Sequence, residues 1–277
     1  MEKYNQLHYN AVTEFWQKVM GDNLHFGYFK TEKTPLSSAT NELIDKMAGL
    51  VNINKDTKVL DVGCGIGNPA FYLHKKFKCP ILGITTSDRG IEIANQLSRE
   101  KGFSAKVKFQ FGDGTDNGLP DNSFDLLWVL ESSHLMPKVD LLRECYRVLK
   151  KNGTLLLCDL MLTNRLYSLE HFPVMLRHLF SIMRIGKVFG NTHMASMEYY
   201  WMGFHKAGFN EIISIDISER VVPTLKNWKE NAIKNKGKNH QNLPNSAINK
   251  FIKACEIVEY FYKTRYLSYA IFKGVKY

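Results

Sequence analysis

Between residues 58 and 160, short apolar runs alternate with amphipathic stretches along the chain. The apolar runs predict strands at 58–62, 80–84, 106–111, 124–130 and 154–160. The stretches between them predict helices at 68–77, 88–101 and 138–150. Strands separated by helices of this length pair in parallel, because each parallel connection needs a crossover over one face of the sheet. We therefore expect an α/β protein with a doubly wound, mostly parallel sheet.

The flanking segments predict additions to one large domain of 277 residues. Residues 1–36 end near the aromatic stretch HFGYF at 25–29, which either closes over a cleft or packs a helix on the sheet. Between 161 and 205 a stretch rich in methionine and aromatic residues predicts a helical insertion before the last strands. These residues, at helical spacing, suit an apolar acceptor pocket, although such apolar stripes more often belong to a core, so part of them is expected to pack inward.

Charge and cysteine content narrow the class of protein. Lys and Arg exceed Asp and Glu by 37 to 27, which is compatible with nucleic acid, an anionic ligand or an acidic membrane surface. Part of the excess lies in the lysine-rich stretch 227–242, which we interpret as a solvated loop, and Arg165, Arg177, Arg184 and Lys187 leave room for an anionic head group. The five cysteines contain no CxxC pair, and no disulfide framework or metal site is predicted. Without a membrane-length apolar run or a signal peptide, a cytoplasmic location is expected.

The sequence DVGCGIGN at 61–68 joins the first predicted strand to the first helix. In an open parallel sheet this turn commonly forms the floor of a ligand site. Gly63, Gly65 and Gly67 permit close approach of the main chain to a ligand. Their spacing is not the dinucleotide fingerprint, and Thr85 stands where an acid would follow the second strand, which disfavours a nicotinamide cofactor.

The order of VLDVGCGIGN, GITTS, FGDGTDNGLPDNSFDLLW and ESSHLMPKVDLLRECYRVLKKNGTLLLCDL resembles the class I S-adenosylmethionine-dependent methyltransferases over about the first 160 residues. The segments FWQKVMGDNLHFGYF and ES.H.MP are similar to a small-molecule group that includes tocopherol methyltransferases and the rebeccamycin sugar O-methyltransferase. The resemblance implies a seven-stranded Rossmann-like methyltransferase fold, S-adenosyl-L-methionine as cofactor and no metal. One departure is Gly90, where relatives often carry Gln.

The resemblance also implies a cofactor site. Gly63, Gly65 and Gly67 would pass under the methionine and ribose moieties, Asp61 would lie near the amino group, and Asp113 would meet the adenine amine. The remaining implied cofactor contacts are Thr85 and Thr86, which replace the ribose-binding acid, Gly114, and Tyr28 in residues 1–36, a segment that the resemblance favours as a lid.

Three side chains are candidates for catalysis. Methyl transfer needs an aligned acceptor and, for a hydroxyl, a base that takes its proton. His134 follows the fourth strand and its imidazole titrates near neutral pH, while Asp159 at the end of the fifth strand would orient it or act in its place, as suggested for the rebeccamycin-like relatives. Glu131 or Tyr28 would stabilise a cation if the acceptor is an alkene.

We therefore expect methyl transfer to a small, largely apolar metabolite, on oxygen or carbon, with nitrogen as a further option. Two alternatives stay open: a non-catalytic S-adenosylmethionine-binding interaction module, and an RNA or protein methyltransferase. The absence of an appended nucleic-acid module and of an NPPY-type tetrapeptide disfavours nucleic acid as the substrate. The sequence assigns neither the acceptor nor an oligomeric state.

Overall fold

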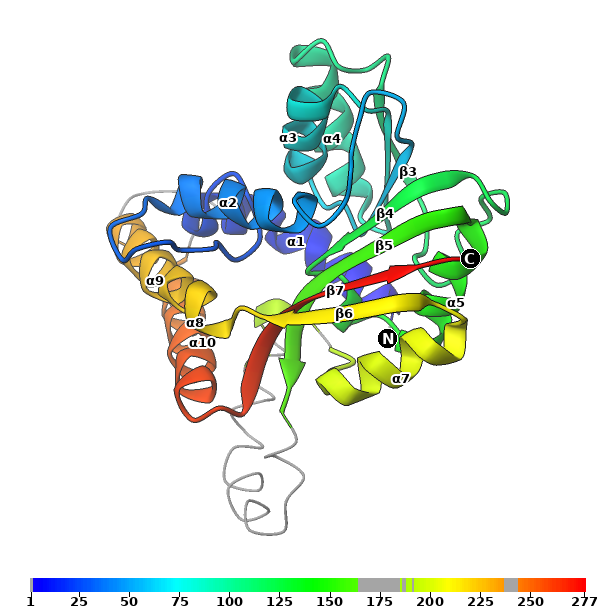
Figure 1. Cartoon of the computed structure of the whole chain (residues 1–277). Coiled ribbons are helices and arrows are strands. Elements are labelled where there is room, and N and C mark those ends of the chain that lie inside the picture. The colour runs from blue at the N-terminus through cyan, green and yellow to red at the C-terminus, as the bar shows by residue number, and fades with distance from the viewer. Residues whose placement is uncertain (1, 164–184, 186–187, 191, 237–243) are drawn as a thin grey trace.

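The computed structural model describes residues 2–163, 185, 188–190, 192–236 and 244–277. In these residues seven strands form one sheet in the order β3-β2-β1-β4-β5-β7-β6 (Figure 1). The strands are β1 Val59–Val62, β2 Ile81–Thr85, β3 Val107–Phe111, β4 Phe124–Leu130, β5 Leu149–Leu162, β6 Asn210–Asp216 and β7 Leu267–Val275. The first five run parallel, and β7 lies antiparallel between β5 and β6. The mostly parallel seven-stranded sheet is therefore confirmed.

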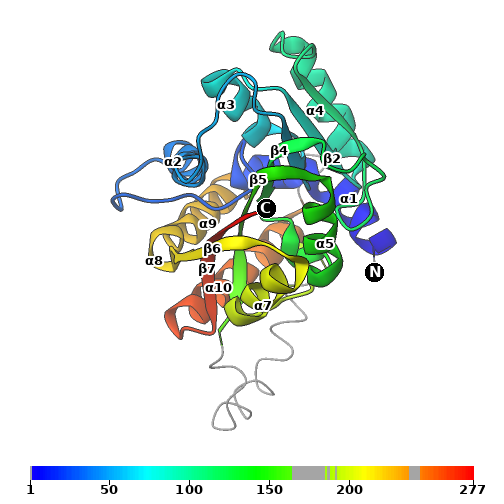
Figure 2. The same cartoon turned by 45° about the vertical axis from the view of Figure 1, so that its right-hand side comes forward.

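Helices lie on both faces of this sheet (Figures 1 and 2). They are α1 Glu2–Met20, α2 Leu36–Ala48, α3 Asn68–Phe77, α4 Asp88–Glu100, η1 Ser133–Leu135, α5 Lys138–Val148, α7 Met197–Ala207, α8 Ser218–Val221, α9 Pro223–Asn235 and α10 Asn245–Lys263. The crossover helices α3, α4 and α5 begin at the predicted residues, because each has an apolar stripe that covers the sheet.

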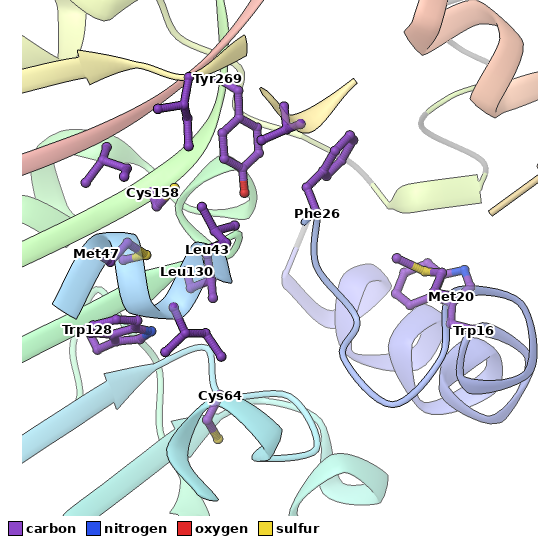
Figure 3. Packing of buried hydrophobic residues seen from close by; sticks show 14 of the residues in the cluster. Trp16, Met20, Phe26, Leu43, Met47, Cys64, Trp128, Leu130, Cys158 and Tyr269 are labelled. Carbon is purple, nitrogen blue, oxygen red and sulfur yellow. The ribbon is translucent and has the colours of Figure 1, made fainter. Parts of the chain in front are cut away.

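The central strands are buried on both faces, and alternate residues enter different cores. Val59 and Trp128 pack with α1–α4, α9 and α10, whereas Leu60 and Leu127 pack with α5 and α7. Figure 3 shows part of the first core, including Trp128, Cys158 and Tyr269. Because the parallel strands are packed on both faces, their carboxyl ends are held in fixed positions at the same end of the sheet.

The prediction of a solvated loop at 227–242 is wrong for the first part of that stretch. This part belongs to α9. Trp228 and Ala232 are one helical turn apart and are buried against the core, while Lys226 and Lys234 are exposed. Charged residues on the outer face masked the apolar stripe. Residues 237–243 lie outside the described residues.

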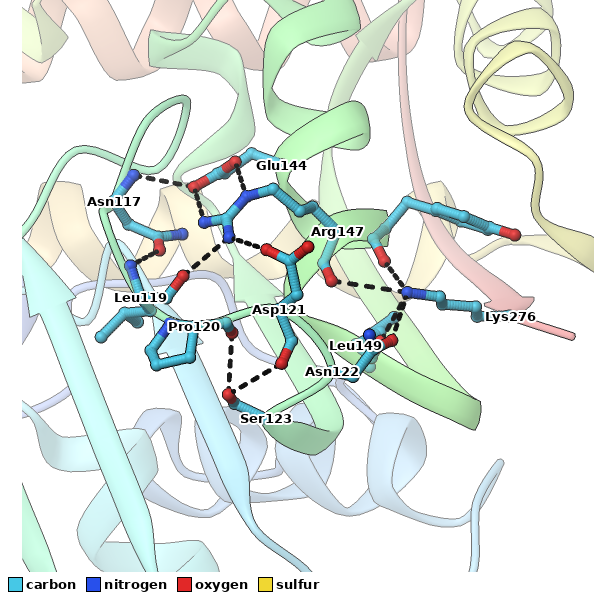
Figure 4. A network of polar contacts seen from close by, with 11 residues as sticks. Asn117, Leu119, Pro120, Asp121, Asn122, Ser123, Glu144, Arg147, Leu149 and Lys276 are labelled. Atoms are coloured by element: carbon cyan, nitrogen blue, oxygen red, sulfur yellow. Dashed lines mark hydrogen bonds and ion pairs between the residues drawn. The ribbon is translucent and has the colours of Figure 1, made fainter.

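A polar network fixes the loop between β3 and β4 against α5 (Figure 4). Arg147 Nη1 donates to the carbonyl of Leu119 at 2.7 Å, and Glu144 Oε1 accepts from the backbone N–H of Asn117 at 2.9 Å. The hydrogen bonds of the Arg147 guanidinium to Glu144 join these two contacts. The loop that carries Asp113 is thereby anchored on the same helix that packs beneath β4.

All five cysteines are buried and free. Among the described helices, none combines the length and apolar character needed to cross a membrane.

Candidate functional site

A cavity of about 560 Å³ opens at the carboxyl ends of β1, β2 and β4. Its floor is the glycine loop after β1, and its opposite wall comes from α1, α9, α10 and the segment 22–26. Ligands of open α/β sheets bind at this edge, where crossover connections diverge to opposite faces. Nine of the sequence-predicted site residues line it together: Asp61, Gly63, Gly65, Thr85, Thr86, Asp113, Gly114, Glu131 and His134.

The three loop glycines have positive φ angles but different neighbours. A Cβ added at Gly63 would lie 2.2 Å from the Cβ of Ser132, and one at Gly67 would lie 2.5 Å from the Phe109 ring. Gly65, at φ +54°, has nothing within 4 Å of such an atom and lines the cavity. The expectation that all three pass under a ligand therefore fits Gly65 best, whereas Gly67 makes room for a protein side chain and does not line the cavity.

Gly90, the departure from the family pattern, has a packing reason. A Cβ at this position would lie 2.9 Å from the carbonyl oxygen of Gly65. The N-terminus of α4 thus lies directly against the glycine loop, and a glutamine there would push the two apart.

Asp61 is the polar group that most needs a ligand. It is the last residue but one of β1, is 3 % exposed, and its Oδ2 has no hydrogen-bond partner. Burial raises the pKa of its carboxyl to about 7. A buried carboxylate oxygen without a partner is costly, so an amino group bound beside Gly65 would find an acceptor that the protein itself leaves open.

The far end of the cavity holds the other expected cofactor contacts. Asp113 Oδ1 accepts from both the backbone N–H and the hydroxyl of Thr115, each at 2.7 Å, which orients the carboxylate. Thr85 and Thr86 line the cavity at the end of β2, and so does Gly114, where an added Cβ would lie 2.6 Å from Met136 Sδ. These contacts fit an adenosine group: an acceptor for an exocyclic amine at Asp113 and hydroxyls in place of an acid at β2.

His134 and Asp159 form a buried pair beneath the cavity. His134 Nδ1 lies 2.9 Å from Asp159 Oδ1, and the backbone N–H of His134 donates to Asp159 Oδ2 at 2.9 Å. Asp159 also accepts from Ser133 Oγ at 2.6 Å and from the backbone N–H of Leu160 at 2.8 Å. His134 lines the cavity, and Asp159, which is 0 % exposed, does not. The carboxylate therefore acts on the cavity through the imidazole.

The ionisation of Asp159 follows from these contacts. Burial by itself would raise its pKa, but His134 and the hydrogen bonds from His134 and Ser133 outweigh burial and hold the pKa below 3.8. The ionised carboxylate accepts a hydrogen bond from the Nδ1–H of His134, so Nε2 is the ring nitrogen that is left to face the cavity.

Glu131 occupies the tip of β4 with a left-handed backbone, φ +50°. Its Oε1 accepts from the backbone N–H of Phe26 at 2.6 Å and from the hydroxyl of Tyr269. Burial raises the pKa of Glu131 to about 8, although both hydrogen bonds oppose the shift. Non-glycine residues in this conformation concentrate at functional sites, and here the conformation sets a carboxyl group in the cavity wall.

The aromatic stretch of residues 25–29 belongs to a covering segment, residues 22–29, which is irregular and is fixed by its backbone. Its four consecutive N–H groups from Phe26 to Phe29 donate to four different elements: the Glu131 carboxylate, Thr224 Oγ1, the Ala39 carbonyl and the Arg220 carbonyl. His25 and Phe26 line the cavity. Tyr28 does not line it and lies beside α2, with the Lys46 ammonium 6.0 Å from its ring.

The C-terminal part of the cavity wall was not predicted from the sequence. Leu225 and Trp228 of α9 and Val258 and Phe261 of α10 line the cavity together with Trp16 of α1. The helical spacing of Trp228 and Leu225 was visible, but the surrounding lysines favoured a loop. The partner helix for these side chains lies far away in the sequence, so spacing alone could not place them.

The predicted insertion 161–205 divides between two roles. Tyr200 and Phe204 of α7 are buried in the second core, with Phe204 5.5 Å from the Phe272 ring, and no residue of α7 lines the cavity. The apolar stripe of α7 is therefore core, because it faces the sheet. The described residues Leu162, Ile185, Phe189, Thr192 and Met194 do line the cavity. Arg165, Arg177, Arg184 and Lys187 lie outside the described residues.

Comparison with known proteins matches this architecture. Residues 60–157 match the family described as "Methyltransferase domain". The chain is 30% identical over 236 residues to the 27-O-demethylrifamycin SV methyltransferase of Amycolatopsis mediterranei, covering 85% of this chain and 83% of that protein. It is 32% identical over 162 residues to the chloroplastic tocopherol O-methyltransferase of Arabidopsis thaliana, covering 54% of this chain and 47% of that protein. The structure of the cyclopropane synthase MmaA2 from Mycobacterium tuberculosis superposes with a TM-score of 0.89 at 17% identity, over 99% and 98% of the two chains.

Proposed function

This chain belongs to the S-adenosylmethionine-dependent methyltransferases that act on small molecules, and on that premise we propose that it methylates a hydroxyl group of a largely apolar metabolite. The observation that carries the proposal is the His134–Asp159 pair, with 2.9 Å between His134 Nδ1 and Asp159 Oδ1 at the cavity. An imidazole held in this way takes a proton at Nε2, which a hydroxyl acceptor must lose.

The cofactor is S-adenosylmethionine, and its sulfonium supplies the methyl group as an electrophilic carbon. The residues suited to hold it are Asp61 for the amino group, the bare backbone of Gly65, and Asp113 for the adenine amine. These groups lie on the glycine-loop side of the cavity. The opposite side, formed by α1, α9, α10 and the covering segment, therefore remains available to the methyl acceptor.

The acceptor side of the cavity is chiefly apolar. Its walls include Trp16, Phe26, Leu225, Val258 and Phe261. These side chains bind an acceptor through its apolar surface and exclude water from the reacting groups. The described residues that line the cavity include no Lys or Arg.

Turnover with labelled S-adenosylmethionine tests the proposal directly. The panel pairs γ-tocopherol, a phenol on an apolar body, with its preformed methyl ether, in which the hydroxyl is blocked. We expect methyl transfer to the phenol oxygen and none to the ether, with the position fixed by mass spectrometry. Transfer to a carbon of an isoprenoid alkene such as geraniol, at equal rates in wild type and His134→Ala, would contradict O-methylation and leave the methyltransferase assignment standing.

The pH profile provides a second test. If His134 is the base, the rate with the phenol depends on an unprotonated imidazole and rises with pH as that imidazole loses its proton. The His134→Gln variant, which offers an amide but no proton acceptor of comparable basicity, serves as the control and loses that rise.

A further inference from the structure

His25 lines the cavity, and its ring has one buried nitrogen that nothing in the described protein satisfies. Its Nδ1 lies 2.7 Å from the carbonyl oxygen of Phe26, its ring is 3 % exposed, and its Nε2 has no hydrogen-bond partner. A carbonyl oxygen only accepts, so Nδ1 carries the proton and Nε2 is a bare acceptor. Burial lowers the pKa of His25 to about 4, although the hydrogen bond with Phe26 opposes this shift. The lowered pKa keeps the ring neutral.

The covering segment holds this ring in place. Phe26 donates its N–H to Glu131 and accepts from His25, so a single residue positions both groups. Gly27 has no room for a side chain, since an added Cβ would lie 2.7 Å from the Cβ of Ala39. The orientation of His25 is therefore set by packing and by the main chain.

A second buried polar atom lies in the same wall. Trp228 lines the cavity, its Nε1 is buried without a partner, and its ring lies 4.8 Å from the Phe26 ring. Among the described polar atoms of this wall that lack a partner, His25 Nε2 is an acceptor and Trp228 Nε1 is a donor. A hydroxyl can donate to His25 and can also accept from a donor such as Trp228, whereas a carboxylate or an ether cannot donate to His25.

From these observations we propose that His25 is a specificity-determining residue that accepts a hydrogen bond from a neutral hydroxyl of the methyl acceptor. The inference rests on the proposed apolar acceptor cavity and adds a requirement to it: the bound molecule carries a donor at this wall. His25 selects the molecule, and proton removal stays with His134.

Two substitutions separate the two ring nitrogens. His25→Asn keeps an amide N–H near the position of Nδ1 and has nothing at Nε2, whereas His25→Gln places an amide oxygen near Nε2. The probes are 1-decanol, whose hydroxyl donates, and decyl methyl ether, which only accepts. Calorimetry is done on enzyme saturated with S-adenosylhomocysteine, in a His134→Ala background that removes the other imidazole of the cavity.

We expect the preference for decanol over the ether to fall about three- to tenfold in His25→Asn and to be largely retained in His25→Gln, as for one neutral hydrogen bond. An equal preference in all three proteins overturns the role of His25 and leaves the proposed function intact. A drop in S-adenosylhomocysteine affinity in His25→Asn, with an unchanged preference for decanol, also overturns it by assigning Nε2 to the cofactor. If neither probe binds any of the proteins, the apolar acceptor cavity itself is wrong and the inference fails with it.

Discussion

Replacing Asp159 with Asn tests whether the buried pair serves catalysis or only folding. Oδ1 of Asp159 accepts from His134 Nδ1 and from the Leu160 N–H, and Oδ2 accepts from Ser133 Oγ and from the His134 N–H. An amide has one donor end. In either orientation that end meets a main-chain N–H, either that of Leu160 or that of His134, and neither can turn round to accept.

The expected cost follows from these contacts. One buried N–H loses its acceptor, so the free energy of unfolding should fall by about 1 to 3 kcal/mol. The remaining pair is neutral, and the His134 tautomer is no longer imposed by a carboxylate, so kcat should fall by about 10²- to 10⁴-fold. In wild type the stabilisation from the lowered pKa of Asp159 is present above pH 3.8 and is lost as the pH falls through its lower folded-state pKa, and Asp159→Asn removes this dependence.

Urea unfolding and steady-state transfer to γ-tocopherol measure the two effects. Ser133→Ala is the comparison variant, because it removes the 2.6 Å hydrogen bonds of Ser133 Oγ to the same carboxylate and to the buried Tyr200 hydroxyl without touching the imidazole. It should lower stability by about 1 to 3 kcal/mol and leave kcat within about threefold of wild type. In a His134→Ala background, Asp159→Asn should have little further effect on kcat. If Asp159→Asn lowers the free energy of unfolding but leaves kcat at the wild-type value, the orienting role of Asp159 is refuted.

Three further predictions concern the cavity. Gly65→Val should abolish S-adenosylmethionine binding in calorimetry while the protein stays folded, and Gly102→Val, with a similar φ of +69° and equal space, controls for backbone strain outside the cavity. Asp113→Ala should weaken cofactor binding by about 1 to 3 kcal/mol, whereas Asp116→Ala, which is outside the cavity, should not. Burial raises the pKa of Glu131 to about 8, so protonated Glu131 favours the folded state. This contribution to the free energy of unfolding is fully present below pH 4.5 and is lost as the pH rises through 8. The melting temperature of wild type should thus drop more between pH 5 and pH 9 than that of Glu131→Gln, and equal drops would contradict the shift.

The sequence predicts the sheet half of the cavity well, because that half is built from local patterns. Asp61, Gly65 and Glu131 each follow or end an apolar run, and parallel strands bring such positions to one edge whatever the remaining contacts are. The pairing of His134 with Asp159 could be expected for the same reason, since His134 follows β4 and Asp159 lies near the carboxyl end of the neighbouring strand β5.

The wall opposite could not be predicted from spacing. Trp228 and His25 meet the cavity only because α9 and the covering segment pack together across a long stretch of sequence, and neither segment has an edge-of-sheet position that fixes it. Gly63 and Gly67 show the other limit: their need for glycine arises from Ser132 and Phe109, which lie on other strands or loops. The pattern indicates that a glycine is required but not which atoms require it.

The covering segment also bears on how the chain reaches its active form. The N–H of Gly27 bonds to a side chain 197 residues further along, and α1 packs on α9. Contacts this distant in sequence close late, because their loops carry the largest entropy. During synthesis the strands β1 to β5 can pair before α9 is made, while α1 and residues 22–29 still lack the helix on which they pack. A nascent or truncated chain that lacks α9 would therefore leave the aromatic residues of α1 exposed to other proteins, and we expect chaperone association to end when α9 and α10 have left the ribosome.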